Sequence, residues 1–330
     1  MIVSTISILA GFGLLVWGAD RFVMGAAALA RNLGVQPLLV GLTVVGFGTS
    51  APEILVSGTA AVQGNPGLAV GNAIGSNIAN IGLILGFTSI LAPLTVHSDT
   101  LRREYPLLLG VSIGAWLLMS DGMLGRLDGG ILLLGLVAAM VLVVRIGLAR
   151  GAGDPLVAEF EAEIPKGIDT RAAVGWFLVG LLVLLVSSRI LVWGAVNIAQ
   201  FFGVSDLVIG LTIVAIGTSL PELAASVASA LKNEHDIAIG NVIGSNLYNL
   251  LAVLSLPGLL APAALSQEVL SRDLPVMLLL TSALYILGRG FRGPGRINRL
   301  EGLVLLAGFV AYQIWLFRDH VPPGTLGGPA

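Results

Sequence analysis

The stretch Gly48-Thr49-Ser50-Ala51-Pro52-Glu53 occurs a second time as Gly217-Thr218-Ser219-Leu220-Pro221-Glu222. Each copy places one carboxylate inside a long apolar part of the chain. A charged side chain at the centre of a bilayer costs roughly 2.5–3.5 kcal/mol, so a residue of this kind points to a functional site. Two glutamates at equivalent positions in the two copies indicate that both serve the same function.

The two copies belong to a longer internal duplication. The second copy begins 169 residues after the first, at position 217 against position 48, and this offset holds over a long stretch without a gap. Function is expected in what both copies retain. The other matching pairs are Gly41-Leu42-Thr43 with Gly210-Leu211-Thr212, Gly71-Asn72 with Gly240-Asn241, Gly75-Ser76-Asn77 with Gly244-Ser245-Asn246, and Asn80 with Asn249.

The composition is that of an integral membrane protein. Hydrophobic residues make up 56% of the 330 residues and charged residues only 11%, which lies outside the range of soluble domains. A net charge of -2 indicates no nucleic-acid partner. The absence of cysteine excludes disulfides and thiolate metal sites. The three histidines, His97, His235 and His320, have no metal-ligand partner at helical spacing and are interpreted as surface residues.

Apolar stretches of about 20 residues are long enough to cross the bilayer as helices. We count ten, and the predicted fold class is an all-α integral membrane protein of ten transmembrane helices. An odd number of five spans in each copy means that the second copy enters the membrane from the opposite face, which gives two inverted five-helix repeats. The predicted spans are 2–20, 37–62, 68–93, 104–120, 127–148, 171–195, 206–231, 237–262, 271–289 and 300–317.

Basic residues in short loops prefer the cytoplasmic side and therefore predict the orientation. With the N-terminus outside, thirteen Lys and Arg residues fall in inward loops, and Arg126, Arg189, Arg272 and Arg318 fall outside. We therefore expect a multi-pass protein of the cell membrane with both termini outside.

The expected domain division follows from the repeats. Residues 1–149 form the first transmembrane repeat, 150–170 an acidic cytoplasmic linker, 171–320 the second, inverted repeat, and 321–330 a disordered tail rich in Pro and Gly. The linker lacks the alternating glycine and acid pattern of a calcium loop, so we interpret it as a solvated connection.

Proline should break the helix just before each glutamate. Pro52 removes a backbone donor and clashes with the carbonyl one turn back, which frees carbonyls around Gly46 to Gly48. Such backbone is tolerated at membrane depth where it lines a cavity or packs against protein. Thr49 and Ser50 lie four and three residues before Glu53 and can share its side of the helix. The same holds for Thr218, Ser219 and Glu222, with carbonyls freed near Ala215.

A second motif, Gly-Asn-x-Ile-Gly-Ser-Asn-x-x-Asn, adds a serine and an asparagine four residues apart in each copy: Ser76 with Asn80, and Ser245 with Asn249. Its glycines allow helices to approach closely, so that the polar groups of both copies can converge. Small and polar residues also hold membrane helices together by hydrogen bonds, and this motif alone does not distinguish the two roles.

The glutamates favour a site for hard cations. Calcium takes six to eight oxygens at about 2.3–2.6 Å, and two bidentate carboxylates supply four of them. Two glutamate charges also cancel those of one Ca²⁺, which reduces the cost of desolvation. Hydroxyl, amide and carbonyl oxygens suit a singly charged ion such as Na⁺.

These motifs resemble the α-repeats of the cation/calcium exchanger superfamily, in particular its sodium/calcium exchanger branch of the prokaryotic type without a regulatory domain. The resemblance covers nearly the whole chain and implies alternating-access antiport of Ca²⁺ against Na⁺, without a cofactor or an obligate protein partner. By motif it implies calcium ligands at Glu53, Glu222, Thr49 and Thr218. It implies sodium ligands at Ser50, Ser76, Ser219, Ser245 and Asn80, and at the carbonyls of Gly46 and Ala215.

One departure concerns Asn249, where many relatives have an acid that is tied to K⁺ use in potassium-dependent members. Two buried acids instead of three argue against K⁺ dependence. Asn249 is kept as a candidate ligand that binds an ion weakly, holds a water or only packs.

Our main hypothesis is an electrogenic, K⁺-independent Na⁺/Ca²⁺ antiporter. The alternative is a proton-coupled Ca²⁺ antiporter, in which Glu53 and Glu222 take up protons; the extra serines and asparagines weigh against it. A cation channel would share the oxygen-lined site but needs a continuous pore. An enzyme is not expected, because no Gly-Asp pair, HExxH motif or serine-base partner accompanies the two acids.

Overall fold

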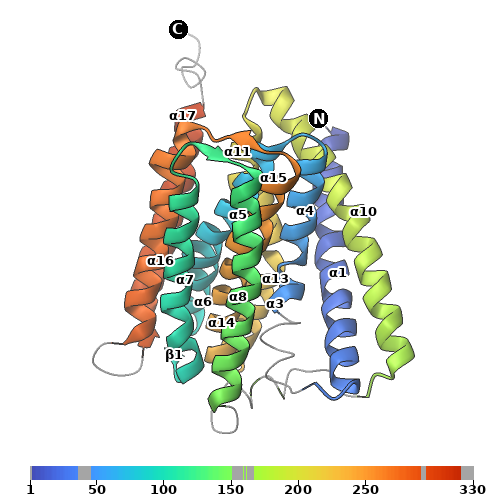
Figure 1. Ribbon diagram of the computed structural model, residues 1–330, viewed down its shortest axis with the longest axis vertical. Helices are drawn as coiled ribbons and strands as arrows, with labels where there is room; N and C mark the ends of the chain where they lie inside the picture. The colour runs from blue at the N-terminus through green and yellow to red at the C-terminus, as the bar shows by residue number, and fades with distance from the viewer. Residues whose placement is uncertain are drawn as a thin grey trace.

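Apolar helices make up almost all of the described chain (Figure 1). A computed structural model describes residues 2–35, 46–150, 159, 161, 167–290 and 295–320. Seven of the described helices are long and apolar enough to cross a membrane, or up to eight if a pair bent at a short break counts as one span. This agrees with the membrane protein expected from composition.

In the first half of the chain the helices alternate with two very short strands. The elements are α1 (Ile2–Asn32), α3 (Gly46–Thr49), α4 (Ala51–Val62), α5 (Pro66–Ala79), the π-helix η2 (Asn80–Leu85), α6 (Gly86–Leu91), β1 (Leu94–Val96), α7 (Asp99–Leu118), β2 (Met123–Leu124) and α8 (Arg126–Arg150).

The second half has a similar order. It contains α10 (Thr170–Phe202), α11 (Asp206–Ile209), η4 (Gly210–Val214), α12 (Ala215–Thr218), α13 (Leu220–Leu231), α14 (His235–Tyr248), η5 (Asn249–Val253), α15 (Ser255–Leu260), β3 (Ala263–Ala264), η6 (Val269–Asp273), α16 (Leu274–Arg289), β4 (Gly295–Ile297) and α17 (Arg299–His320). Strand β1 pairs antiparallel with β4, and β2 with β3.

The predicted spans compare with these helices as follows. The first span was predicted to end at residue 20, but α1 continues to Asn32, because Asp20 and Arg21 do not interrupt its helical backbone. Part of span 37–62 lies outside the described residues, and α4 within it is a shorter apolar helix. Helix α7 begins with several charged residues and is not among the seven candidate spans. The total of ten spans therefore stays a prediction.

Four helices recur with both bounds shifted by the 169 residues of the sequence repeat, and a π-helix recurs with its first residue so shifted. Helices α3, α4, α5 and α6 have the same lengths as α12, α13, α14 and α15, and the π-helices η2 and η5 begin at the matching Asn80 and Asn249. The local structure therefore follows the duplication in the sequence, and the inverted arrangement of the two repeats stays a prediction.

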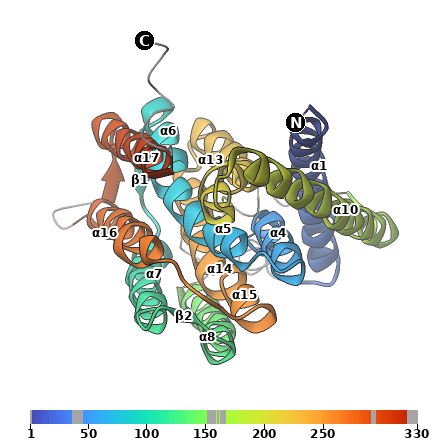
Figure 2. The same cartoon turned by 90° about the horizontal axis from the view of Figure 1, so that it is seen from above.

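Helices α1 and α10 form a pair at one side of the molecule (Figures 1 and 2). Glycines allow their backbones to approach: a Cβ added at Gly25 would lie 2.4 Å from the Phe177 nitrogen, and one added at Gly180 would lie 2.4 Å from the Phe22 nitrogen. Small residues at such contacts are typical of packed membrane helices.

Helices α5 and α14 occupy the interior of the bundle (Figure 2). The spans containing them, Pro66–Leu91 and His235–Leu260, are 78% and 83% buried over their most apolar windows, far more than the other candidate spans. A glycine seam joins α5 to η4, where a Cβ added at Gly210 would lie 2.5 Å from the Leu68 carbonyl oxygen. The two helices that carry the second motif are thus the most enclosed.

Candidate functional site

Each glutamate follows a break in its helix. Ser50 separates α3 from α4 with φ -84° and ψ 3°, and Ser219 separates α12 from α13 with φ -83° and ψ 7°. The axes of the segments 206–218 and 220–231 differ by 42° at the second break. Proline follows two residues after each serine, so the predicted helix breaks before Glu53 and Glu222 are confirmed.

The carbonyls at the breaks differ in part from the prediction. The Ala215 carbonyl was expected to be freed, but it accepts a hydrogen bond from the Ser219 nitrogen at 3.1 Å. The Gly46 carbonyl accepts from Thr49 Oγ1 at 3.2 Å. The Ala215 carbonyl also accepts from Thr218 Oγ1 at 3.4 Å, so both of its lone pairs are engaged by protein donors.

Both glutamates are fully buried, and each is bonded to one serine. Ser219 Oγ donates to Glu53 Oε1 at 3.3 Å, and Ser245 Oγ donates to Glu222 Oε1 at 3.3 Å. Oε2 of each glutamate has no hydrogen-bond partner, and neither glutamate forms an ion pair among the described residues. Two carboxylates are therefore buried without a basic partner in the described part of the chain.

Contacts between the two halves bring the predicted residues together. The Ser219 to Glu53 bond joins residues from different copies, and Thr49 Oγ1 lies 3.4 Å from Ser245 Oγ. Asn80 Nδ2 donates to Asn246 Oδ1 at 3.0 Å. The predicted residues thus form two hydrogen-bonded groups, Ser219 with Glu53, and Thr49 with Ser245 and Glu222.

Four further predicted residues are buried and have side-chain atoms without a hydrogen-bond partner among the described residues. Ser50 Oγ, Ser76 Oγ, Asn80 Oδ1 and both side-chain atoms of Asn249 have no hydrogen-bond partner in the described residues. All four side chains are 0% exposed. More than 90% of buried polar groups in proteins are bonded, so these atoms are the ones that a cation or a water would satisfy.

Sequence reasoning assigned no role to Asn72 and Asn241, although both repeat at the common offset. Asn72 Nδ2 donates to the Glu53 carbonyl at 3.2 Å and to Ser57 Oγ at 2.9 Å. Asn241 Nδ2 donates to the Glu222 carbonyl at 3.2 Å and to Ser226 Oγ at 3.2 Å. The signal available in the sequence was the paired identity of Asn72 with Asn241.

The donor set suits a hard cation more than a soft one. No group of three or more His, Cys, Asp or Glu side chains converges as a metal site among the residues that the structure describes. Any ion between the two carboxylates would therefore complete its shell with hydroxyl, amide and carbonyl oxygens, which are the ligands of Ca²⁺ and similar ions.

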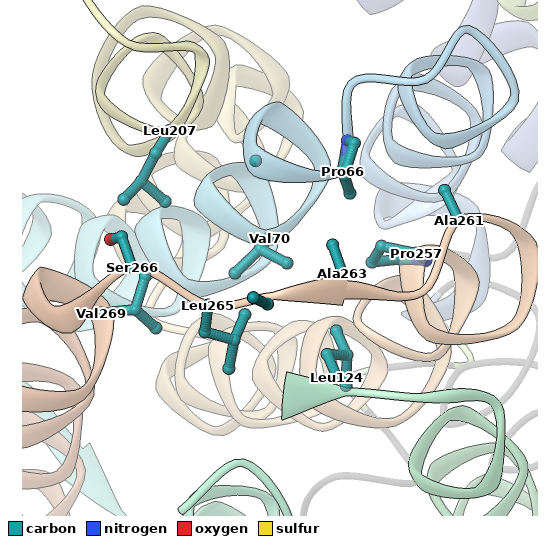
Figure 3. Close-up of a pocket in the computed structure, with 12 residues that line it drawn as sticks. Pro66, Val70, Leu124, Leu207, Pro257, Ala261, Ala263, Leu265, Ser266 and Val269 are labelled. Carbon is teal, nitrogen blue, oxygen red and sulfur yellow. The ribbon is translucent and has the colours of Figure 1, made fainter. Parts of the chain in front are cut away.

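Two cavities lie outside this cluster. One of about 140 Å³ is lined almost entirely by apolar side chains, among them Val70, Leu207 and Val269, and contains none of the predicted ligands (Figure 3). A larger one of about 590 Å³ extends from Leu33 at the end of α1 to Phe47 and Tyr248. None of the predicted ligands lines the larger cavity, although Phe47 lies two residues before Thr49 and Tyr248 directly precedes Asn249 in the sequence.

Comparison with known proteins matches nearly the whole chain. The sequence profile of the family described as "Sodium/calcium exchanger protein" matches residues 3–145 and 172–318. The protein CaxA of Alkalimonas amylolytica is 50% identical over 97% of this chain and 100% of its own length. The sodium/calcium exchanger MaX1 of Methanosarcina acetivorans is 32% identical over 96% of this chain and 99% of its own.

A solved structure has the same fold. The sodium-calcium exchanger NCX_Mj, soaked with 100 mM Na⁺ and 10 mM Sr²⁺, matches with a TM-score of 0.66 and 33% identity, over 94% of this chain and 97% of that one. The matching family and fold are those of membrane transporters.

Proposed function

Because the chain belongs to the sodium/calcium exchanger family, we propose that it is a secondary antiporter that exchanges Ca²⁺ for Na⁺ by alternating access. The observation that carries the proposal is the pair of buried carboxylates, Glu53 and Glu222, each with one unbonded oxygen and neither with a basic partner in the described chain. Desolvated negative charges of this kind need a cation or protons to offset them.

In the proposed cycle, Ca²⁺ binds between the two carboxylates together with the hydroxyls of Thr49 and Thr218. Calcium would neutralise both charges, and this neutral complex could then change the side to which the site is open. Release of Ca²⁺ leaves the two charges uncompensated, so the empty site is held from switching until sodium binds. Because the empty site cannot switch, Ca²⁺ transport is coupled to Na⁺ binding and the protein acts as an exchanger and not as a leak.

Sodium would bind at hydroxyl, amide and carbonyl oxygens beside the glutamates. The buried oxygens without partners at Ser50, Ser76 and Asn80 support this assignment. The other proposed ligands are Ser219, Ser245, Asn249 and the carbonyls of Gly46 and Ala215. If three Na⁺ exchange for one Ca²⁺, one net charge crosses in each cycle, worth about 2.3 kcal/mol per 100 mV.

Potassium is not expected to take part. Asn249 is fully buried and its amide has no partner among the described residues. It provides no third negative charge to offset an additional cation. We therefore propose exchange that is independent of K⁺, with Asn249 contributing at most neutral oxygen.

For the architecture, we propose ten spans in two inverted repeats, at residues 1–149 and 171–320, joined by the cytoplasmic linker 150–170 and followed by the tail 321–330. The helix bounds repeated at a shift of 169 residues support the two repeats. Equivalent hydrogen bonds also run between the copies in both directions: Thr218 of the second copy donates to Asn72 of the first, and Thr49 of the first donates to Asn241 of the second. Reciprocal hydrogen bonds of this kind are expected when two repeats are related by a two-fold axis. The proposed orientation has both termini outside.

Radiocalcium uptake into proteoliposomes tests the function. Vesicles loaded with sodium and diluted into sodium-free medium should take up Ca²⁺, and equal gradients of protons or K⁺ should not drive uptake. Glu53→Gln and Glu222→Gln should each abolish sodium-driven uptake, because one carboxylate cannot neutralise Ca²⁺. Uptake driven by a proton gradient without sodium would instead favour the proton-coupled antiporter. Rapid flux without any counter-ion would indicate a channel.

A further inference from the structure

Asn72 connects three elements at the centre of the molecule. It lies on α5 and is 0% exposed. Its Nδ2 donates to the Glu53 carbonyl at 3.2 Å and to Ser57 Oγ at 2.9 Å, both on α4. Its Oδ1 accepts from Thr218 Oγ1 at 3.1 Å, on α12 in the other half of the chain. Both ends of the amide are thus engaged by protein groups.

The Glu53 carbonyl fixes which way the amide faces. A backbone carbonyl can only accept hydrogen bonds, so the atom of Asn72 beside it must be the nitrogen. The oxygen is then directed at Thr218. This orientation follows from the chemistry of the partner and does not depend on distinguishing nitrogen from oxygen.

Asn241 on α14 repeats the arrangement in the other direction. Its Nδ2 donates to the Glu222 carbonyl at 3.2 Å and to Ser226 Oγ at 3.2 Å, and its Oδ1 accepts from Thr49 Oγ1 at 3.3 Å. Each asparagine therefore holds the glutamate segment of its own copy and the threonine of the opposite copy.

These bonds decide where the threonine hydroxyls point. The Thr218 hydroxyl has the Asn72 oxygen at 3.1 Å, the Val214 carbonyl at 3.0 Å and the Ala215 carbonyl at 3.4 Å, and all three can only accept its single hydrogen. The hydrogen is held by these groups, and the oxygen lone pairs remain for a cation. Groups behind a ligand that fix its orientation in this way commonly change metal affinity about 10–100-fold when they are removed.

We propose that Asn72 and Asn241 are positioning residues that each act on the threonine of the opposite repeat, a role that rests on the proposed function. Each holds the glutamate backbone of its own repeat and presents the threonine hydroxyl of the opposite repeat to Ca²⁺. In this proposal neither asparagine is itself an ion ligand, because its oxygen is directed at the threonine hydroxyl of the opposite repeat. Calcium binding then requires both repeats to be docked on each other.

Calcium binding by the purified full-length protein tests the role of each asparagine. Isothermal titration in sodium-free buffer should show that Asn72→Ala and Asn241→Ala each weaken Ca²⁺ binding about 10–100-fold. Ser112→Ala is the matched control, because among the described residues this buried hydroxyl bonds only to the Leu108 carbonyl of its own helix. It should bind Ca²⁺ as the unmodified protein does. If one asparagine variant does not fold, the other provides the same test.

Double variants distinguish positioning from general loss of structure. Asn72→Ala combined with Thr218→Val should weaken binding less than the product of the two single effects, because part of the effect of Asn72 acts through that hydroxyl. Asn72→Ala combined with Thr49→Val, the threonine of its own repeat, should give the full product. Asn241→Ala should show the reverse pairing, coupling with Thr49 and not with Thr218.

Each outcome bears on one claim. The crossed pattern of coupling supports the proposal. Equal coupling to both threonines, coupling within one repeat, or single variants that bind Ca²⁺ normally would overturn it while leaving the exchanger intact. If the unmodified protein binds no Ca²⁺ in the same titration, the proposed function itself fails.

Discussion

At the scale of single residues, the site is marked by buried oxygens that have no hydrogen-bond partner among the described residues. Ser76 Oγ is 0% exposed and has no partner among the described residues. Ser112 and Ser89, which are equally buried, bond to carbonyls of their own helices. Among the described residues Ser76 thus differs from these serines, and an ion or a water would supply its missing bond.

We therefore predict that Ser76→Ala raises the Na⁺ concentration that half-saturates exchange by roughly 10-fold, since a bond to a charged group contributes about 1.5–3 kcal/mol. Ser112→Ala should leave this concentration unchanged. Sodium dependence of calcium efflux from proteoliposomes measures both. A Ser76→Ala protein with normal sodium dependence would remove Ser76 from the set of sodium ligands.

The two glutamates and their serines and threonines could be predicted because charged and polar residues inside apolar stretches are conspicuous and repeat. The role of Asn72 could not, since its bond to Thr218 joins residues 146 positions apart. Which face of α5 meets α12 depends on tertiary packing. An asparagine in a membrane helix is also typical of residues that only hold two helices together by hydrogen bonds.

At the scale of elements, prolines predicted the breaks before Glu53 and Glu222, and the structure has them at Ser50 and Ser219. The π-helices that begin at Asn80 and Asn249 were not predicted. No proline or glycine signal marks them uniquely, and such turns are common at functional sites. They alter the direction of side chains that follow the second motif.

The glycine seam between α5 and η4 supports a prediction at this scale. Gly210→Ala should abolish exchange and lower the thermal unfolding temperature, because the new Cβ would lie 2.5 Å from the Leu68 carbonyl and force the helices apart. Gly114→Ala is the control, since its Cβ would meet nothing within 4 Å of the described residues. Fluorescence-detected unfolding together with uptake compares the two variants. Equal behaviour of both would mean that close approach at this seam is not required.

At the scale of the whole molecule, composition and the positions of apolar stretches were sufficient to predict a helical membrane protein with an internal duplication. Helix lengths were less predictable: α1 extends to Asn32, well beyond the apolar part that was read as a span. Hydropathy reports where a helix leaves lipid, whereas its end depends on capping and on its neighbour α10. The orientation rests on the distribution of basic residues alone.

Because the chain contains no cysteine, single substitutions report orientation without background. Ser120→Cys, in the turn before β2, should react with a membrane-impermeant thiol reagent added outside intact cells. Arg296→Cys, exposed in β4, should react only after the membrane is opened. The reverse pattern would invert the proposed topology, and labelling of both from outside would contradict the predicted number of spans between them.

The central claim is that one hard cation is held jointly by Glu53 and Glu222. A crystal structure of the sodium-free protein soaked with Sr²⁺, with the ion located by its anomalous scattering, tests it most directly. We predict one strong peak between the two carboxylates, bonded to both at about the 2.3–2.6 Å expected for calcium-like ions. A peak bonded to only one glutamate, or two carboxyl groups too far apart to share an ion, would contradict the account.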